Sequence, residues 1–189
     1  MSLSRWMLEP ESWWEGIARQ LDAAPAAALN RALATIVIGA LVMASAAELG
    51  ARVFNVNWSS ALGVMTRPDG FLSPFAFTFA GALLWPLLLA ALMAALMPMF
   101  GRPRRWAPAL LVAVHGAAPL YVTSVALIVY AGTLLFVIAF VISGFWWTAG
   151  TRRLLGVATR EAAEFVAVTV LGAIILSQFV GAMLSGLLS

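Results

Sequence analysis

Long stretches of this chain carry no charged side chain. Charge-free runs of 32, 46 and 25 residues cover Gly70 to Gly101, Trp106 to Thr151 and Phe165 to Ser189, and a run of 16 residues covers Ala32 to Ala47. About 20 apolar residues cross a bilayer as a helix, whereas core segments of soluble folds are shorter. The pattern therefore predicts an all-α, polytopic membrane helix bundle that forms a single membrane domain over residues 1–189.

The apolar runs and their boundaries predict five transmembrane helices. We expect them at about residues 28–51, 74–97, 107–123, 126–148 and 163–187. The run from Trp106 to Thr151 must be a hairpin, because a single helix of that length would reach about 69 Å, twice the hydrocarbon thickness. Its candidate turns are Pro119 and Thr123-Ser124. This arrangement places Trp146 and Trp147 at the membrane interface, as an aromatic belt requires.

A short amphipathic helix precedes the first span, at residues 10–22. Pro10 suits the first helical position, where its missing N–H is not needed. Apolar and charged side chains occupy opposite faces: Trp13, Trp14, Ile17 and Leu21 against Glu11, Glu15, Arg19 and Asp22. Two interpretations stay open, an interfacial helix in the headgroup plane or a helix packed on the protein's own loops.

The first apolar run also has features of a signal peptide, with a small-residue site at Ala44-Ser45-Ala46. The polar segment before it is too long and too acidic for a signal peptide, because it carries three Arg against four acidic residues. We therefore expect a retained first transmembrane helix.

Composition excludes several kinds of chemistry. The chain has no Cys and, among its eleven basic residues, no Lys, which excludes disulfides, iron–sulfur ligation and Schiff-base chemistry. The sequence contains no HExxH motif, no pair of Asp within the spans and no Gly-rich phosphate loop. We therefore predict a protein that is not an enzyme and that has no cofactor and no metal.

The charges between the spans predict an orientation. With five spans, nine Arg fall on the side of the N-terminus and only Arg52 and Arg67 on the other. This positive-inside bias predicts a cytoplasmic N-terminus and an external or lumenal C-terminus. We expect the membrane to be a bacterial inner membrane, in which case the C-terminus is periplasmic. The pI of about 10.6 then reflects loops that face anionic lipid, not nucleic acid. We expect the loop arginines to contact lipid headgroups or a partner: Arg102, Arg104, Arg105, Arg152 and Arg153.

One ionisable residue lies well inside a predicted span, and it is His115. Three interpretations remain open for this residue. Its ring is hydrogen-bonded to a backbone carbonyl freed by Pro119, or it makes a polar contact with a partner or a quinone-like molecule, or it ligates a metal.

Small residues recur at every fourth position of the last predicted span: Ser177, Gly181 and Ser185. Such a ridge lets another helix approach closely. That helix belongs either to this protein's own bundle or to a partner.

Residues from about 100 to 176 resemble the Yip-domain family of integral membrane proteins, in its bacterial form. The resemblance rests on a basic Phe-Gly loop, a His-x-x-x-Pro step where the family more often has Tyr, and the segment between the last two spans: Phe100-Gly101-Arg102, His115-Gly116-Ala117-Ala118-Pro119, Ser143-Gly144-Phe145 and Thr159-Arg160-Glu161-Ala162. The opening Leu8-Glu9-Pro10 is also similar. The resemblance implies five spans, a cytoplasmic N-terminus and no enzymatic activity.

We therefore expect a non-catalytic integral membrane protein that acts as a scaffold, accessory or stabilising subunit of a larger membrane assembly. Its partners would be membrane lipids and a membrane protein. The alternative is a small transporter or permeability factor, which the sequence favours less because no charged group marks a pathway and no inverted repeat is visible.

Overall fold

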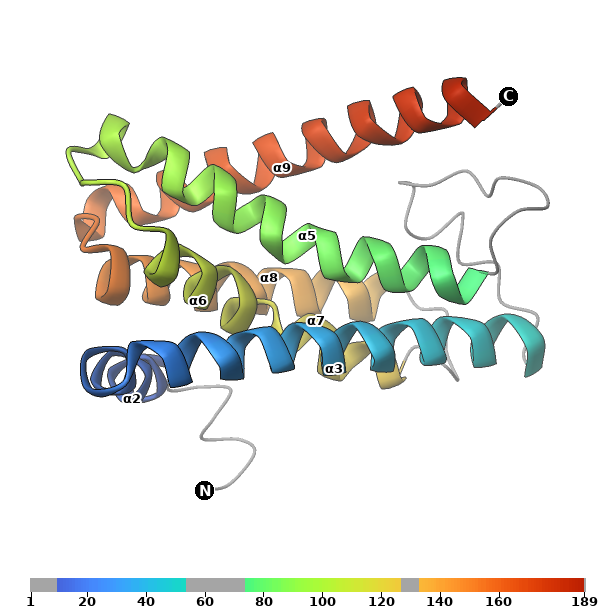
Figure 1. The fold of residues 1–189 in the computed structure, drawn as a ribbon, viewed down its shortest axis with the longest axis horizontal. Coiled ribbons are helices and arrows are strands. Elements are labelled where there is room, and N and C mark those ends of the chain that lie inside the picture. The colour runs from blue at the N-terminus through green and yellow to red at the C-terminus, as the bar shows by residue number, and fades with distance from the viewer. Residues whose placement is uncertain (1–9, 54–73, 127–132, 189) are drawn as a thin grey trace.

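The computed structural model describes residues 10–53, 74–126 and 133–188, and all regular secondary structure of these residues is helical, with short connections between the helices (Figure 1). The elements are α2 (Pro10–Ala23), α3 (Pro25–Val53), α5 (Pro74–Leu96), the 3-10 turn η1 (Met97–Phe100), α6 (Trp106–Gly116), α7 (Ala118–Ala126), α8 (Thr133–Gly150), the π-helical turn η2 (Thr151–Leu155) and α9 (Thr159–Leu188). Three of the helices begin at a proline, the residue whose missing N–H costs nothing at the first helical position.

Four stretches of the described chain are long and apolar enough to cross a membrane. They are Pro25–Leu49, Thr78–Phe100, Trp106–Val125 and Thr159–Phe179. The prediction of an all-α membrane bundle is confirmed. The fourth predicted span, at residues 126–148, corresponds to α8, whose 18 described residues reach about 27 Å, slightly less than the hydrocarbon thickness.

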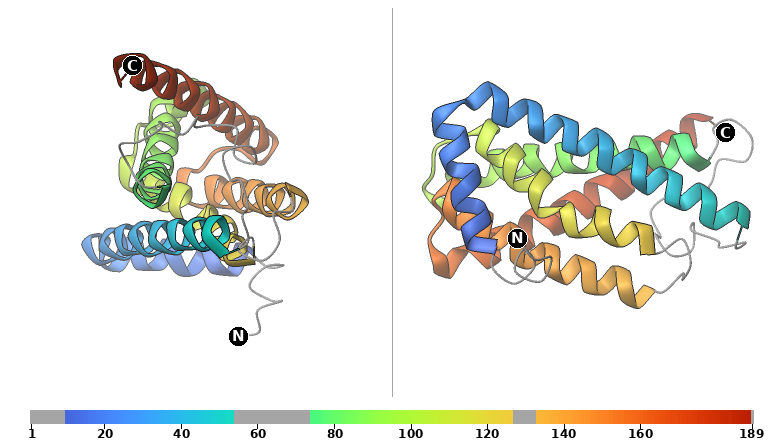
Figure 2. Two further views of the ribbon diagram at one scale, coloured as in Figure 1. Left: turned by 90° about the vertical axis from the view of Figure 1, so that its right-hand side faces the viewer. Right: turned by 90° about the horizontal axis from the view of Figure 1, so that it is seen from below.

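The long helices run alongside one another, and α2 lies across one end of them (Figures 1 and 2). Helix α3 is antiparallel to α5, the α6–α7 pair returns in the direction of α3, and α8 runs back beside it. Helix α9 crosses α5 at an angle. One end of the bundle therefore collects α2 and the start of α3, the end of α5, the start of α6, the end of α8, and the start of α9. We call this end the basic end, because it carries the described loop arginines.

The turn of the predicted hairpin does not lie at Thr123-Ser124. Both residues are inside α7, which continues to Ala126. Their hydroxyls donate to carbonyls of the same helix, Thr123 to Pro119 O at 2.6 Å and Ser124 to Tyr121 O at 2.6 Å. Because both hydroxyls are hydrogen-bonded within the helix, these residues continue α7 and do not end it. The connection to α8 lies outside the described residues.

Pro119 does not form the turn either, but it interrupts the helix. The break lies at Ala117, whose N–H donates to Val114 O at 3.1 Å instead of to the carbonyl four residues back. A proline disrupts the helical turn before it, since its ring collides with the carbonyl of residue i−4 and it offers no N–H. The chain then resumes as α7 in nearly the same direction (Figure 1).

Small residues line the buried side of α3. Ala28, Ala32, Ile36, Ala40 and Ala44 recur at every fourth position and are all buried. In a bilayer such a stripe lets helices approach closely, and close packing replaces the hydrophobic driving force that water would supply. Tyr121 of α7 reaches α5 in the same core, where its hydroxyl donates to Ala82 O at 3.4 Å.

Candidate functional site at the basic end of the bundle

Helix α2 is docked into the bundle through its apolar face. Trp14 is fully buried and Ile17 is 5% exposed. The Trp14 ring lies directly on Gly150 of α8, where an added Cβ would stand 2.7 Å from Trp14 Cζ2. The structure thus shows α2 packed on helices of the protein itself, and its place in the headgroup plane stays a prediction.

His115 lies beneath this docked helix, within a cluster of tryptophans. Its ring centroid is 6.1 Å from that of Trp13 and 6.3 Å from that of Trp14, both in edge-to-face geometry. Trp146 of α8 contacts the same two tryptophans at 6.2 and 6.3 Å. The position of His115 is therefore set by aromatic packing between α2, α6 and α8.

The free backbone carbonyl near His115 accepts a hydrogen bond from a different residue. The break at Ala117 frees Ala113 O, and the indole of Trp147 donates to it at 3.2 Å. Within the described part of the chain, His115 makes no hydrogen bond. The sequence did identify the freed carbonyl near Pro119, but the donor comes from α8.

Trp147 also fixes the distance between α6 and α8. The ring covers Gly116 so closely that a Cβ there would lie 2.0 Å from Trp147 Cδ1. Trp146 and Trp147 are 1% and 0% exposed, so they do not form the lipid-facing aromatic belt that the sequence predicted. The reason is that α2 and α6 cover the side of α8 from which both indoles project.

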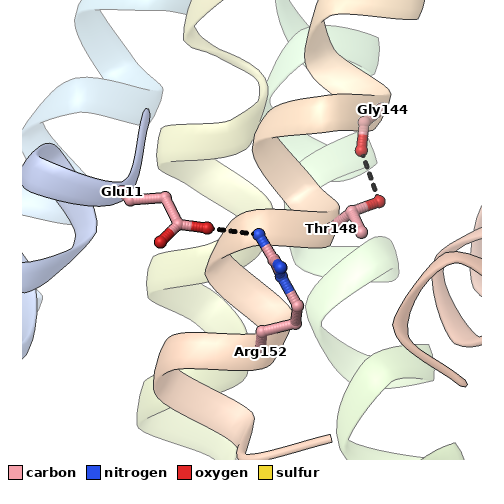
Figure 3. Close-up of polar contacts among 4 residues, drawn as sticks. All are labelled: Glu11, Gly144, Thr148 and Arg152. Carbon is pink, nitrogen blue, oxygen red and sulfur yellow. Dashed lines mark hydrogen bonds and ion pairs between the residues drawn. The ribbon is translucent and has the colours of Figure 1, made fainter. Parts of the chain in front are cut away.

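Acidic residues of α2 pair with the basic residues of η2. Glu11 forms an ion pair with Arg152 (Figure 3), and Glu15 Oε1 lies 3.8 Å from Arg153 Nη2. Arg152 and Arg153, predicted to contact lipid or a partner, thus have carboxylates of this chain beside them. Glu11 and Arg152 are 141 positions apart, so no local pattern could indicate the pair.

The other three predicted arginines face outward. Arg102, Arg104 and Arg105 are exposed in the loop between η1 and α6, and no ion pair with another described residue involves them. The Arg102 guanidinium carbon lies 3.8 Å from where a Cβ on Gly156 would stand, so this loop lies against the loop between η2 and α9. Arg102, Arg104 and Arg105 form an exposed cationic surface beside that loop, suited to phosphate groups of lipid.

The small-residue ridge begins in α9 just beyond the last residue that the described part of the chain buries. Phe165, Thr169 and Ala173 are fully buried, but Ser177, one turn further on, is half-buried and its hydroxyl donates to Ile174 O at 2.8 Å. The side chains at Gly181 and Ser185 lie outside the described residues. The ridge therefore begins where the described residues no longer cover α9.

The described residues contain no group of three His, Cys, Asp or Glu side chains that could hold a metal ion. The basic end brings together the aromatic cluster that holds α2, two ion pairs and an exposed arginine surface. These features hold α2 on the bundle and leave arginine side chains exposed. Comparison with family models, with curated proteins and with solved structures finds no match for this chain.

Proposed function

We propose that this chain is a non-catalytic integral membrane protein that acts as a scaffold, accessory or stabilising subunit of a larger membrane assembly. We place it with the five-span proteins of the Yip-domain family, on the motifs given above. Its setting would be a bacterial inner membrane, with the N-terminus in the cytoplasm and the C-terminus in the periplasm.

One observation carries this proposal: the described chain leaves a stretch of α9, from Ile174 to Phe179, without a buried side chain. The helix has 30 residues, about 45 Å at 1.5 Å per residue. Its buried side chains end at Ala173, and from Ile174 to Phe179 none is buried. Helices in a bilayer are stabilised by close packing on other helices. The stretch of α9 from Ile174 to Phe179 is therefore a surface available to a membrane partner.

The basic end supports the proposed orientation. The loops that carry Arg102, Arg104 and Arg105, and those that carry Arg152, Arg153 and Arg160, meet at the same end of the bundle. Clustered arginines favour the cytoplasmic face, where they bind anionic lipid headgroups. The exposed arginine surface then holds this end at the membrane surface.

The test is the mass of the particle extracted from native membranes. Solubilisation in a mild detergent, followed by affinity capture and mass measurement, should give a particle heavier than one 20.1 kDa chain with stoichiometric protein content. A monomer of this chain alone, extracted under conditions that preserve other membrane complexes, would contradict the scaffold proposal. A monomer that also carries ions or solutes across vesicles would support a transporter instead.

A further inference from the structure

Two opposite stripes of α9 differ sharply in their surroundings. One stripe faces α5 and α8 and is buried, at Ala162, Phe165, Thr169 and Ala173. The other, which we call the outer stripe, consists of Val168, Leu171, Ile175 and Gln178. Its apolar members are 45%, 59% and 67% exposed, and Gln178 is exposed as well. The spacing of three and four residues along the outer stripe is that of helices that pack in a left-handed pair.

Gln178 indicates what covers the outer stripe. It lies 14 residues beyond Glu164, the last charged residue of the chain, which is about 21 Å along the helix and therefore inside a hydrocarbon layer about 30 Å thick. In the described structure its carboxamide has no hydrogen-bond partner. Lipid tails offer neither donor nor acceptor, and a polar group without one is costly there. The molecule that covers the outer stripe must therefore present a polar group at this depth.

We propose that the outer stripe of α9 binds the same stripe of a second copy of this chain. Every copy has the same orientation in the membrane, so the two-fold axis of a dimer stands along the membrane normal and each stripe residue meets itself. A carboxamide has both donors and an acceptor. Gln178 of one copy can therefore form hydrogen bonds with Gln178 of the other. A polar residue at one position of an apolar seam also fixes how the two helices align along their length.

The charged start of the helix fits the same pairing. By helical register Arg160 and Glu164 continue the outer stripe toward the basic end, and both are exposed. They carry opposite charges, and neither is paired with another described residue. In a parallel dimer the arginine of each copy can reach the glutamate of the other. The inference rests on the proposed function, because it names the partner that begins the assembly.

Cysteine cross-linking tests the contact directly, because the chain has no Cys of its own. Leu171→Cys and Ile175→Cys, oxidised in native membranes, should each give a disulfide-linked dimer of this chain. The matched control is Ile38→Cys on α3, which is 61% exposed but lies on a different helix. Cross-linking of the α9 variants no stronger than that of the control would overturn the proposal.

Gln178→Leu tests the role of the carboxamide. In vesicles of phosphatidylethanolamine and phosphatidylglycerol, energy transfer between labelled copies should show the dimer association constant lowered roughly threefold to thirtyfold, the range for interhelical hydrogen bonds in membranes. Gln178→Asn keeps a self-complementary amide and should stay closer to the parent. Unchanged tryptophan fluorescence would show that each variant folds. Dimerisation of Gln178→Leu equal to the parent would contradict the pairing.

The two proposals fail in different ways. A cross-link from Ile175→Cys to another protein, with no dimer of this chain, would overturn the second-copy inference and leave the scaffold proposal standing. No cross-linked product, together with a monomer in mild detergent, would overturn both.

Discussion

At the residue scale, two glycines decide how closely tryptophans approach helix backbones. Gly116 lies under Trp147 and Gly150 under Trp14, and at each position an added Cβ would lie closer to the ring than 3 Å. The indole rings thereby tie α8 to α6 and α2 to α8. A methyl group at either glycine must push a large, fully buried ring out of place.

We expect Gly116→Ala to destabilise the protein by about 1–3 kcal/mol, the usual cost of overpacking a filled core. Unfolding in detergent, followed by tryptophan fluorescence, measures the change. Gly144→Ala is the matched control, because it also lies in a helix but a Cβ there meets no atom within 4 Å. If both variants were equally stable, the close approach of Trp147 to Gly116 would be refuted.

His115 should act as an aromatic ring rather than as a polar group. His115→Phe keeps the edge-to-face contacts with Trp13 and Trp14, so we expect little change in the free energy of unfolding. His115→Ala loses those contacts, which are worth about 0.5–1.5 kcal/mol per aromatic pair. An equal loss of stability in both variants, or loss of a bound metal or pigment from His115→Phe, would show that the imidazole nitrogens contribute.

At the scale of elements, α2 is held by burial more than by charge. Trp14 is fully buried, whereas the side chains of Glu11 and Arg152 keep 72% and 35% of their surface exposed. Ion pairs at such exposure contribute about 0–1 kcal/mol, and truncation of a buried tryptophan costs about 3–5 kcal/mol. The apolar face therefore dominates the docking.

Trp14→Ala should release α2 from the bundle, whereas Glu11→Gln should not. Hydrogen exchange of the α2 amides in detergent distinguishes the two, with protection lost in the first variant and kept in the second. Trp106→Ala is the control for loss of an indole, because Trp106 is 48% exposed. Release of α2 by Glu11→Gln, or by high salt alone, would mean that charge dominates.

The helices were more predictable than the contacts between them. Pro10 and the charge-free runs mark helix boundaries, and α2 and α5 begin at the expected residues, Pro10 and Pro74. The pairing of Glu11 with Arg152 and the burial of Trp146 depend on which helices become neighbours, which no local spacing encodes. The sequence also could not show that Thr123 and Ser124 bond within α7 rather than end it.

At the scale of the whole molecule, the distribution of arginine predicts the topology. A reporter fused at the C-terminus should be active only outside the cytoplasm, and one inserted at residues 102–105 only inside it. Alkaline phosphatase and green fluorescent protein fusions measure the two cases. Activity of both fusions on the same side of the membrane would exclude five spans.

The docking of α2 across the basic end has a consequence for biogenesis. Helix α2 is secured by residues synthesised much later, because Glu11 pairs with Arg152, which lies 141 positions further along the chain. At about 5–20 residues per second, that delay is roughly 7 to 28 s, during which Trp13 and Trp14 have no bundle to enter. A chain truncated before α8 should therefore leave α2 open to protease, and the full chain should protect it. A docked α2 therefore marks a bundle that is complete as far as η2.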